Sequence, residues 1–410
     1  MQKTIKIFTL GCKANQYDSQ LIREKFLCSG FQESNDQLAA HTCLINTCTV
    51  TQRADAESLN LIRRAKRENP KAKIIVTGCL TELDSARIKQ VDKKAVIIKN
   101  KDKENIMAKK LKNISRFSGH TRAFLKIQDG CDNFCAYCKV PLVRGKPRSR
   151  RLSEIVKEAK GLAKNGFKEI VLTGISLGKY GQGLKPQTSL VEVIRELEKI
   201  PGLVRLRLSS IEAGDVTAEL ISLMSRSDKL CRHLHIPLQS GDNQILKRMN
   251  RNYSCEDFLS LIRKIKKKIP GIAITTDVLV GFPGESQDCF NHTLNLIKQI
   301  SPLKVHIFPF SEREGTAAAA FKDKVNPALI KERSVKLRKA ALSCALEYKK
   351  HFLGKLQRVL VESRVKGQLN LWEGYTDNYL KVAIKSACNL QNQLLPVKLK
   401  KITPDYLLAI

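Results

Sequence analysis

The chain is 410 residues long, is 42% hydrophobic and carries a formal net charge of +34. This length predicts two or three domains, and the hydrophobic content excludes a disordered chain. The N-terminal apolar run is too short for a signal peptide and no membrane-spanning run follows it, so we expect a cytoplasmic protein without membrane contact. The excess of 73 Lys and Arg over 39 Asp and Glu favours nucleic acid as a partner. In a reducing compartment, thirteen cysteines favour metal-binding thiolates over disulfides.

Residues 1–113 alternate apolar runs with amphipathic stretches. The runs IKIFTL, CLIN, KIIVTG and AVIIK predict strands, whereas QYDSQLIREKFLCSG and AESLNLIRRAKREN have the apolar spacing of helices. This alternation predicts a small parallel α/β domain of the Rossmann-like kind. The basic, polar segment Lys109–Gly119 predicts a connector to the next domain.

A second series of strand–helix units fills residues 117–345. The predicted strands are AFLKIQ, EIVLTG, LVRLRLSS, HLHIPL, AITTDVLVGF and KVHIFPF, with amphipathic stretches between them. Six such units predict a partial (β/α)6 barrel, whose functional residues lie at the C-terminal ends of its strands. A long helical segment from Asn326 to Phe352 leads out of it. Residues 346–410 change to short β runs separated by turns, which predict a small all-β barrel.

Three cysteines follow the first strand of the predicted central barrel at C-x3-C-x2-C spacing: Cys131, Cys135 and Cys138 in GCDNFCAYC. Three thiolates on one short loop can hold three irons of a 4Fe–4S cube and leave the fourth iron open. An open coordination position is what a catalytic metal site needs. A zinc knuckle is the alternative, but this loop offers no fourth Cys or His. The spacing therefore favours a catalytic iron–sulfur cluster.

Three further cysteines, Cys12, Cys48 and Cys79, each follow a predicted strand of the first domain. The carboxyl ends of parallel strands meet at one edge of a sheet, where ligands gather in open α/β folds. This shared placement indicates a second three-cysteine cluster. The alternative is three buried structural thiols, which is how we interpret the other seven cysteines: Cys28, Cys43, Cys231, Cys255, Cys289, Cys344 and Cys388.

Six motifs extend these signals along the chain: TLGCKANQYDSQ, INTCTVT, VTGC, KIQDGCDNFCAYC, LHIPLQSGDNQILKRMNRNY and DVLVGFPGE. Together they resemble the radical S-adenosylmethionine (SAM) methylthiotransferase family over nearly the whole length. Within that family, Lys13 after the first cysteine and the phrase INTCTVT resemble the threonylcarbamoyladenosine tRNA methylthiotransferases. The chain departs from the family at Lys139, commonly apolar, and at Leu142, often aromatic. The segment KKITPDYLLAI also lacks the glycines of many TRAM domains.

The resemblance implies an enzyme that adds a methylthio group to C2 of N6-threonylcarbamoyladenosine beside the anticodon of tRNA. It implies two 4Fe–4S clusters, a radical-generating one on the central triad and an auxiliary, sulfur-delivering one on the N-terminal triad. SAM is then both radical source and methyl donor, because acid–base chemistry cannot remove the unactivated C2 hydrogen. The implied partners are tRNA, a flavodoxin- or ferredoxin-like electron donor and a sulfur donor. The alternatives are action on isopentenyladenosine in tRNA or on a ribosomal protein, and a non-catalytic iron–sulfur or zinc protein that binds RNA.

The site residues implied by the resemblance divide into two groups, and no catalytic residue beyond the cluster ligands is predicted. The expected SAM contacts are Tyr137, Gly174, Glu212, His235, Gln239 and Gly281. Core packing is the alternative for Tyr137 and His235, and a turn is the alternative for each glycine. The basic run after the triad predicts phosphate contacts from Arg144, Lys146, Arg148, Arg150 and Arg151.

The C-terminal β module resembles the TRAM domain, a small RNA-binding barrel. Its aromatic residues Trp372, Tyr375 and Tyr379 either stack on bases or fill the core of the barrel. For Trp372 we expect the core.

Overall fold

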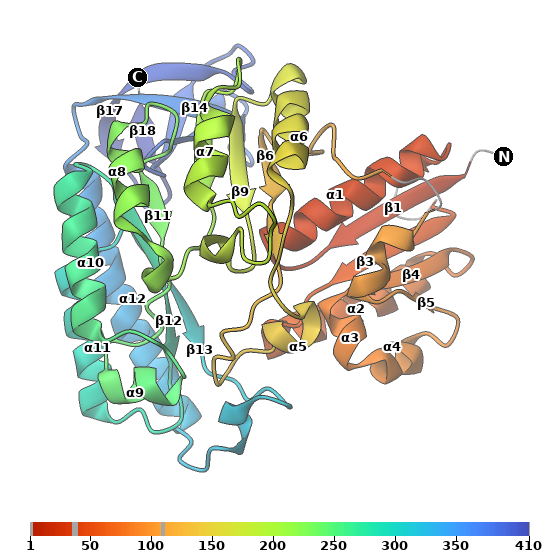
Figure 1. Cartoon of the computed structure of the whole chain (residues 1–410), viewed down its shortest axis with the longest axis horizontal. Coiled ribbons are helices and arrows are strands. Elements are labelled where there is room, and N and C mark those ends of the chain that lie inside the picture. Colours follow the sequence, from red (N-terminus) through yellow and green to blue (C-terminus); the bar gives the residue numbers. More distant parts are fainter. Residues whose placement is uncertain (1–2, 35–39, 108–110, 410) are drawn as a thin grey trace.

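The computed structural model describes residues 3–34, 40–107 and 111–409 in three adjoining parts (Figure 1). The first part is a five-stranded parallel sheet in the order β2-β1-β3-β4-β5. Its strands are β1 (Thr4–Thr9), β2 (Gln32–Glu33), β3 (Thr42–Thr47), β4 (Lys73–Gly78) and β5 (Val96–Ile97). Its helices are α1 (Lys13–Cys28), α2 (Gln52–Glu68), α3 (Cys79–Leu83) and α4 (Ser85–Val91), followed by the 3-10 turn η1 (Asn100–Asn105).

Helices cover both faces of this sheet, which explains why its strands read as continuous apolar runs. Ile22 and Phe26 of α1 pack with Ile5 on one face, whereas Leu59 and Ile62 of α2 belong to the core on the other. Thr51 caps α2 by accepting a hydrogen bond from the backbone N–H of Ala54.

The second part is a curved array of six parallel strands. They form two three-stranded sheets, β10-β9-β6 and β11-β12-β13, and the isolated bridges Leu206–Leu230 and Ser210–His235 join β10 to β11. The strands are β6 (Arg122–Lys126), β9 (Glu169–Thr173), β10 (Arg205–Leu208), β11 (His233–His235), β12 (Ala273–Val280) and β13 (Lys304–Pro309). A short antiparallel pair, β7 (Gln128–Asp129) and β8 (Arg148–Ser149), brackets the loop that carries the cysteine triad.

Helices follow these strands and pack on the convex side of the array (Figure 1). They are α6 (Leu152–Lys164), α7 (Leu190–Glu198), α8 (Ala218–Arg226), α9 (Asn243–Arg248), α10 (Cys255–Lys268), α11 (Gln287–Ile300) and α12 (Pro327–Lys350). The short helix α5 (Val140–Arg144) packs instead against α3 of the first part. The 3-10 turns are η2 (Leu177–Lys179), η3 (Ala213–Asp215) and η4 (Ala317–Ala320). Ser189 and Ser254 form capping boxes that set the starts of α7 and α10.

Alternate strand residues divide between the two faces of this array. Leu206, Leu208, Leu234 and Ile274 belong to the large core beneath the helices. The residues between them face the concave side and are mostly polar: Arg205, Arg207, His233, His235, Thr275, Asp277 and His306. The concave face is therefore lined for polar contacts, and the convex face holds the fold together.

The third part is a closed barrel with the strand order β14-β15-β16-β18-β17. Its strands are β14 (Leu356–Arg364), β15 (Leu371–Thr376), β16 (Lys381–Lys385), β17 (Leu394–Ile402) and β18 (Leu407–Ala409). The expected α/β mixture with a small C-terminal β-barrel is confirmed. The glycine-poor end of the chain nevertheless closes this barrel, because β18 pairs with both β16 and β17.

The connector between the first two parts is packed against both of them. The first two residues of the predicted stretch, 109 and 110, lie outside the described residues. Beyond them, Ile114 and Phe117 are buried in the central core, and Glu24 of α1 accepts hydrogen bonds from the backbone N–H groups of Ser115 and Arg116. The segment therefore fixes α1 to the second part of the chain.

Candidate functional site

Cys12, Cys48 and Cys79 come together at the carboxyl edge of the N-terminal sheet. They follow β1, β3 and β4, which are adjacent in the sheet, and all three line one pocket. Cys12 precedes α1 and Cys79 begins α3, so each lies at the start of a helix. The three cysteines therefore lie together at one edge of the sheet, as their positions directly after parallel strands predicted.

Gly11 and Gly78, which precede Cys12 and Cys79, lie where a side chain would clash with neighbouring atoms. Gly11 has φ +92°, and a Cβ on it would lie 2.7 Å from Sγ of Cys48. Gly78 has φ +103°, and a Cβ there would lie 2.3 Å from the backbone oxygen of Thr47. Both positions are a backbone conformation that glycine adopts without strain. Their missing side chains leave room where the three thiols converge.

Residues from the second part of the chain complete the same pocket. Lys139, Val140, Val143 and Arg144 line it opposite the N-terminal thiols, and all four follow directly on the central triad. The pocket therefore lies between the N-terminal thiols and the segment that directly follows the central triad, and the triad cysteines themselves are not among its lining residues.

A buried ion network joins these two parts beside the pocket. Asp18 of α1 binds Lys103, Lys126 and Arg144, and Arg144 also binds Asp129. The side chain of Arg144 is only 3% exposed, and it donates a further hydrogen bond to Asn15. Arg144 and Lys103 place positive charge near Cys79, which balances the negative charge of thiolates.

The central triad lies on a loop held from below by the segment after α9. The backbone N–H of Ala136 donates to the carbonyl of Met249, and Asn250 donates to the carbonyl of Phe134 at 3.1 Å. Phe134 itself has φ +46° and is 63% exposed. The loop is thus fixed by backbone contacts with a strained residue at Phe134, and its three cysteines are partly buried.

Arg251 is a site residue that sequence reasoning missed. Its Nη1 lies 3.3 Å from Sγ of Cys135 and 3.3 Å from Oε1 of Glu212, and its side chain is 4% exposed. Arg251 belongs to the motif LHIPLQSGDNQILKRMNRNY. Its distance along the sequence from Cys135 gives no indication that the two side chains are in contact. One guanidinium therefore orients both a triad thiol and the expected SAM-contacting carboxylate.

The donor sets fit multi-iron clusters better than single metal ions. A tetrahedral zinc ion with Zn–S bonds of about 2.3 Å holds its sulfurs roughly 3.8 Å apart, whereas a four-iron cube separates its thiolates more widely. Within the described part of the chain, the one group of three or more ligand atoms that all lie within 4.8 Å of one another is His235, Asp277 and His306. Both cysteine sets are more open than a zinc site requires.

The residues expected to contact SAM differ in what surrounds them. Glu212 is held by Arg251, and Tyr137 packs edge-on against Phe282 with ring centroids 6.4 Å apart. Gly174 lies against the side chain of Gln128, since a Cβ there would be 2.9 Å from Oε1. A Cβ on Gly281 would meet Ile330 of α12 at 2.3 Å, so packing against that helix already requires this glycine. Gln239 has φ +67° in the turn after β11.

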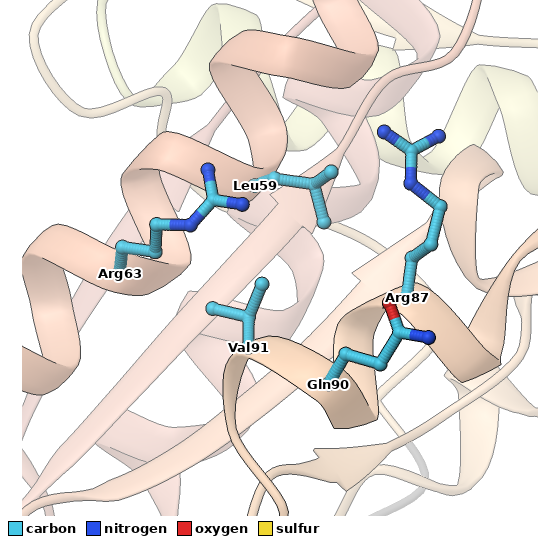
Figure 2. Close-up of a pocket in the computed structure, with 5 residues that line it drawn as sticks. All are labelled: Leu59, Arg63, Arg87, Gln90 and Val91. Carbon is cyan, nitrogen blue, oxygen red and sulfur yellow. The ribbon is translucent and has the colours of Figure 1, made fainter.

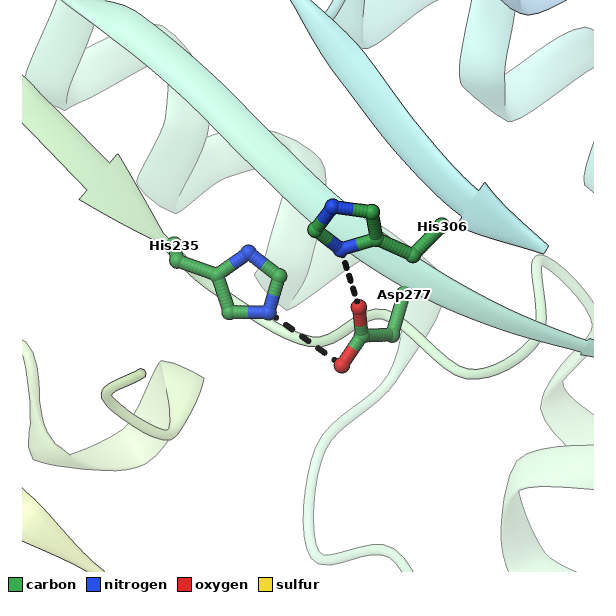
Figure 3. A group of neighbouring side chains, drawn as sticks. All are labelled: His235, Asp277 and His306. Atoms are coloured by element: carbon green, nitrogen blue, oxygen red, sulfur yellow. Dashed lines mark hydrogen bonds and ion pairs between the residues drawn. The ribbon is translucent and has the colours of Figure 1, made fainter. Parts of the chain in front are cut away.

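His235 belongs to a hydrogen-bonded group on the concave face (Figure 3). Asp277 accepts from Nε2 of His235 at 3.2 Å and from Nδ1 of His306 at 3.0 Å. Burial raises the pKa of Asp277, but the two histidines outweigh this effect and lower the pKa to about 2. The other ring nitrogen of His235 contacts Oγ1 of Thr275 at 2.9 Å. Both nitrogens of His235 thus have protein partners, as the core alternative expects.

The basic run after the triad does not act as a unit, and the prediction is wrong for Arg144. That residue is buried in the ion network described above and cannot offer its guanidinium to a phosphate at the surface. Arg150 is mostly buried as well and pairs with Glu158 at 2.6 Å. Lys146, Arg148 and Arg151 are exposed, so contact with RNA remains a prediction for them.

The aromatic residues of the C-terminal barrel are engaged within the protein. Trp372 is 4% exposed and lies in the barrel core, as expected. Tyr379 stacks on His233 at 4.4 Å between ring centroids, and Tyr375 stacks on Tyr379 at 5.1 Å. These two tyrosines join the barrel to the concave face of the strand array, so they are not free to stack on bases.

A second pocket lies on the far side of the N-terminal sheet, between α2 and α4 (Figure 2). It is lined by Leu59, Arg63, Arg87, Gln90 and Val91. Its arginines already have partners, since Arg63 donates to Asn60 and Arg87 to Asp84. The pocket has no thiol in its lining, which distinguishes it from the pocket lined by Cys12, Cys48 and Cys79.

Comparison with known proteins agrees with this geometry. The Radical SAM superfamily model matches residues 125–297, and the model described as Uncharacterized protein family UPF0004 matches residues 4–99. The threonylcarbamoyladenosine tRNA methylthiotransferase MtaB of Bacillus subtilis (strain 168) is 38% identical over 98% of this chain and 95% of its own length. The tRNA-2-methylthio-N(6)-dimethylallyladenosine synthase of Clostridium tetani is 35% identical over 91% of this chain and 88% of its own.

Among solved structures, the radical SAM methyltransferase TsrM from Kitasatospora setae shares the fold. Its TM-score is 0.57 at 13% identity, over 78% of this chain and 77% of that one. The fold and the paired cysteine sets thus define a radical SAM protein that uses SAM and iron–sulfur clusters. More particularly, the chain belongs to the methylthiotransferase family. No helix in the described ranges is long and apolar enough to cross a membrane.

Proposed function

We propose that this protein adds a methylthio group to C2 of N6-threonylcarbamoyladenosine next to the anticodon of tRNA. The observation that carries the proposal is the single pocket lined by Cys12, Cys48 and Cys79 on one side and by Lys139 and Arg144 on the other. A reaction that joins a radical step to sulfur delivery needs its two centres on either side of one substrate base. The relative named for this nucleoside supports the choice of substrate.

We assign the cluster ligands accordingly. Cys131, Cys135 and Cys138 would hold the cluster that binds SAM, and Cys12, Cys48 and Cys79 would hold the auxiliary cluster. When bound, these groups supply a radical able to take hydrogen from an unactivated C–H bond, together with a carrier for sulfur.

The chain's own residues do the positioning. Arg251 fixes Cys135 and Glu212 in one orientation. The ion pairs of Asp18 with Lys126 and Arg144 hold α1 against the second part of the chain, and Arg313 reaches across to Asp55 at 2.7 Å and to Thr49. These contacts set the separation of the two thiol sets, and geometry held by buried, hydrogen-bonded side chains is what such chemistry requires.

We further propose three functional units. Residues 1–113 form a Rossmann-like auxiliary-cluster domain, residues 117–345 a (β/α)6 radical SAM domain, and residues 346–410 a TRAM domain. Lys146, Arg148 and Arg151 are exposed beside the central triad and would contact tRNA phosphates, in keeping with the charge of +34. A flavodoxin- or ferredoxin-like electron donor and a sulfur donor complete the expected partners in the cytoplasm.

Nucleoside analysis of tRNA from a deletion strain tests this proposal. We expect threonylcarbamoyladenosine to lose its methylthio group in the mutant, and to regain it when the wild-type gene is returned. The dimethylallyladenosine relative defines the second candidate function. Loss of methylthio from isopentenyladenosine instead would favour that candidate, and an unchanged nucleoside profile would overturn both.

A further inference from the structure

Lys13 is a half-buried lysine next to Cys12, one of the thiols that line the pocket described above. It is the first residue of α1 and directly follows Cys12. Within residues 3–34, 40–107 and 111–409, its ammonium makes no hydrogen bond or ion pair, in contrast to Lys103 and Lys126 nearby. A partly buried cation without a partner is costly to keep, so its presence points to a partner that arrives with the substrate.

The surroundings of Lys13 place it at the concave face of the strand array. The charged or polar groups within electrostatic range of Lys13 include Tyr379, Arg122 and Arg207. These three form one cluster, with the guanidinium of Arg207 4.9 Å from the ring of Tyr379 and that of Arg122 5.8 Å from the same ring. Since α1 also packs against β6 of the strand array, the start of this helix lies beside the array of the second part.

This region carries more positive than negative charge. Arg122, Arg205 and Arg207 gather around Glu169, and Arg122 also pairs with Glu362 of the C-terminal barrel. His233 adds no charge to the cluster, because burial holds its pKa well below the ordinary value. With Lys13 included, four cations face two carboxylates. The three arginines pair with these two carboxylates, whereas Lys13 makes no ion pair. Lys13 can therefore bind an anion that the substrate brings.

The proposed substrate brings such an anion. The threonylcarbamoyl group ends in a carboxylate, whereas a dimethylallyl group is a neutral hydrocarbon. In adenine, C2 and the carbon that bears N6 both adjoin N1, so the N6 substituent lies on the same edge of the ring as C2. If C2 approaches the auxiliary thiols, the substituent therefore extends among the residues that neighbour Cys12.

We propose that Lys13 binds the carboxylate of the threonylcarbamoyl group and thereby selects this nucleoside over one that carries dimethylallyl. The inference rests on the proposed function and adds a specificity-determining residue to it. The bond is an ammonium–carboxylate pair in a partly desolvated place, where charge-assisted hydrogen bonds are strongest.

Binding without turnover tests the proposal. The anaerobically reconstituted enzyme, with SAM and no reductant, is titrated into three labelled anticodon stem-loop RNAs, and Kd is read from fluorescence anisotropy. The RNAs carry threonylcarbamoyladenosine, its carboxamide analogue or dimethylallyladenosine. The proteins are wild type, Lys13→Gln, Lys13→Arg and Lys298→Gln, the last an exposed lysine on α11. Iron content and SAM binding are measured on each, so that a variant that fails to assemble is recognised.

We expect wild type to bind the acid about tenfold more tightly than the carboxamide, as one charge-assisted hydrogen bond provides. In Lys13→Gln the ratio falls to about one, while Lys13→Arg and Lys298→Gln keep most of it. An undiminished ratio in Lys13→Gln overturns the inference, and so does a ratio of one in wild type. If Lys13→Gln does not assemble, Lys13→Arg with an unchanged ratio supports the inference and with a ratio of one overturns it. The proposed function is tested separately by adding reductant, since it fails only if wild type leaves the threonylcarbamoyl RNA without methylthio.

Discussion

Nη1 of Arg144 lies 3.3 Å from Oδ2 of Asp18, and this ion pair joins α5, which follows the central cysteine triad, to α1 of the N-terminal domain. Asp18 also accepts from Lys103 and Lys126. The network is almost entirely buried, with exposed side-chain fractions of 3% for Arg144 and 7% for Asp18. Because α1 begins one residue after Cys12, the network also sets the position of the auxiliary thiols relative to the radical centre.

Asp18→Asn is expected to destabilise the protein strongly. Removing one partner of a buried ion pair leaves uncompensated charge and costs about 3–5 kcal/mol, and here three cations lose their shared carboxylate. Denaturant unfolding of the wild type and the variant measures the effect. Asp228→Asn, at an exposed position, serves as control and should change stability by no more than about 0.5 kcal/mol. Equal unfolding curves for Asp18→Asn and Asp228→Asn would show that the network is not structural.

The same network predicts a pH dependence. Burial raises the pKa of Asp18, but Lys103, Lys126 and Arg144 outweigh it and hold the pKa far below its usual range. A depressed carboxyl pKa stabilises the fold above the unfolded value, and that stability is lost as pH falls. The stability advantage of wild type over Asp18→Asn should therefore be constant from pH 7 to about pH 5 and then fall, by about 1.4 kcal/mol per unit below roughly pH 3.9. An advantage that grows toward acid would contradict this assignment.

Arg251→Gln should impair the radical centre and spare the auxiliary one. The variant loses the cation that faces both Cys135 and Glu212, so SAM affinity should fall by about tenfold or more. Equilibrium dialysis with labelled SAM measures this, and iron analysis shows whether the clusters assemble. Arg248→Gln is a matched control, because Arg248 binds Asp323 at the surface. Unchanged SAM affinity in Arg251→Gln would remove this residue from the site.

Substitution of the two triads should separate two clusters. We expect about eight irons in wild type and about four in Cys131→Ser or in Cys48→Ser, since each triad holds one cube. Reductive cleavage of SAM should be lost in Cys131→Ser and retained in Cys48→Ser. Cys43→Ser is the control, because Cys43 is buried in the sheet core and should keep both clusters. Eight irons in either triad variant, or zinc in their place, would refute the assignment.

Gly11→Ala should interfere with the auxiliary cluster alone. The added Cβ would lie 2.7 Å from Sγ of Cys48 at a backbone φ of +92°, which alanine adopts only with strain. We expect loss of about half the iron with SAM cleavage intact. Gly30→Ala provides the comparison, since its φ is also positive but nothing lies within 4 Å of its Cβ. Full iron content in Gly11→Ala would show that the space beside Cys48 is not needed.

The pattern of apolar residues in the sequence was sufficient to predict the order of the helices and strands. Apolar runs such as KIIVTG and AITTDVLVGF coincide with β4 and β12, because strands buried on both faces leave a continuous signal. It was sufficient also for the convergence of Cys12, Cys48 and Cys79, since each ends a parallel strand and the strands proved to be neighbours.

Sequence reasoning failed where long-range pairing decides the role of a side chain. In the sequence, Arg144 is one of several basic residues in RGKPRSRR. In the structure it pairs with Asp18, which lies 126 positions earlier. Tyr379 reads as a candidate for base stacking, but His233 occupies its face. Arg251 carries no local signal for its contact with Cys135, 116 positions away. Such partners are set by how separate units pack, which neither composition nor spacing encodes.

The most direct test of the account is mass spectrometry of a threonylcarbamoyladenosine anticodon stem-loop RNA after anaerobic reaction with the enzyme, SAM, dithionite and a sulfur source. The account predicts a product heavier by one methylthio group that replaces hydrogen at C2, with 5′-deoxyadenosine formed alongside it. It also predicts no such product from Cys131→Ser or Cys48→Ser. An unmodified RNA with wild-type enzyme that contains both clusters and cleaves SAM would contradict the central claim.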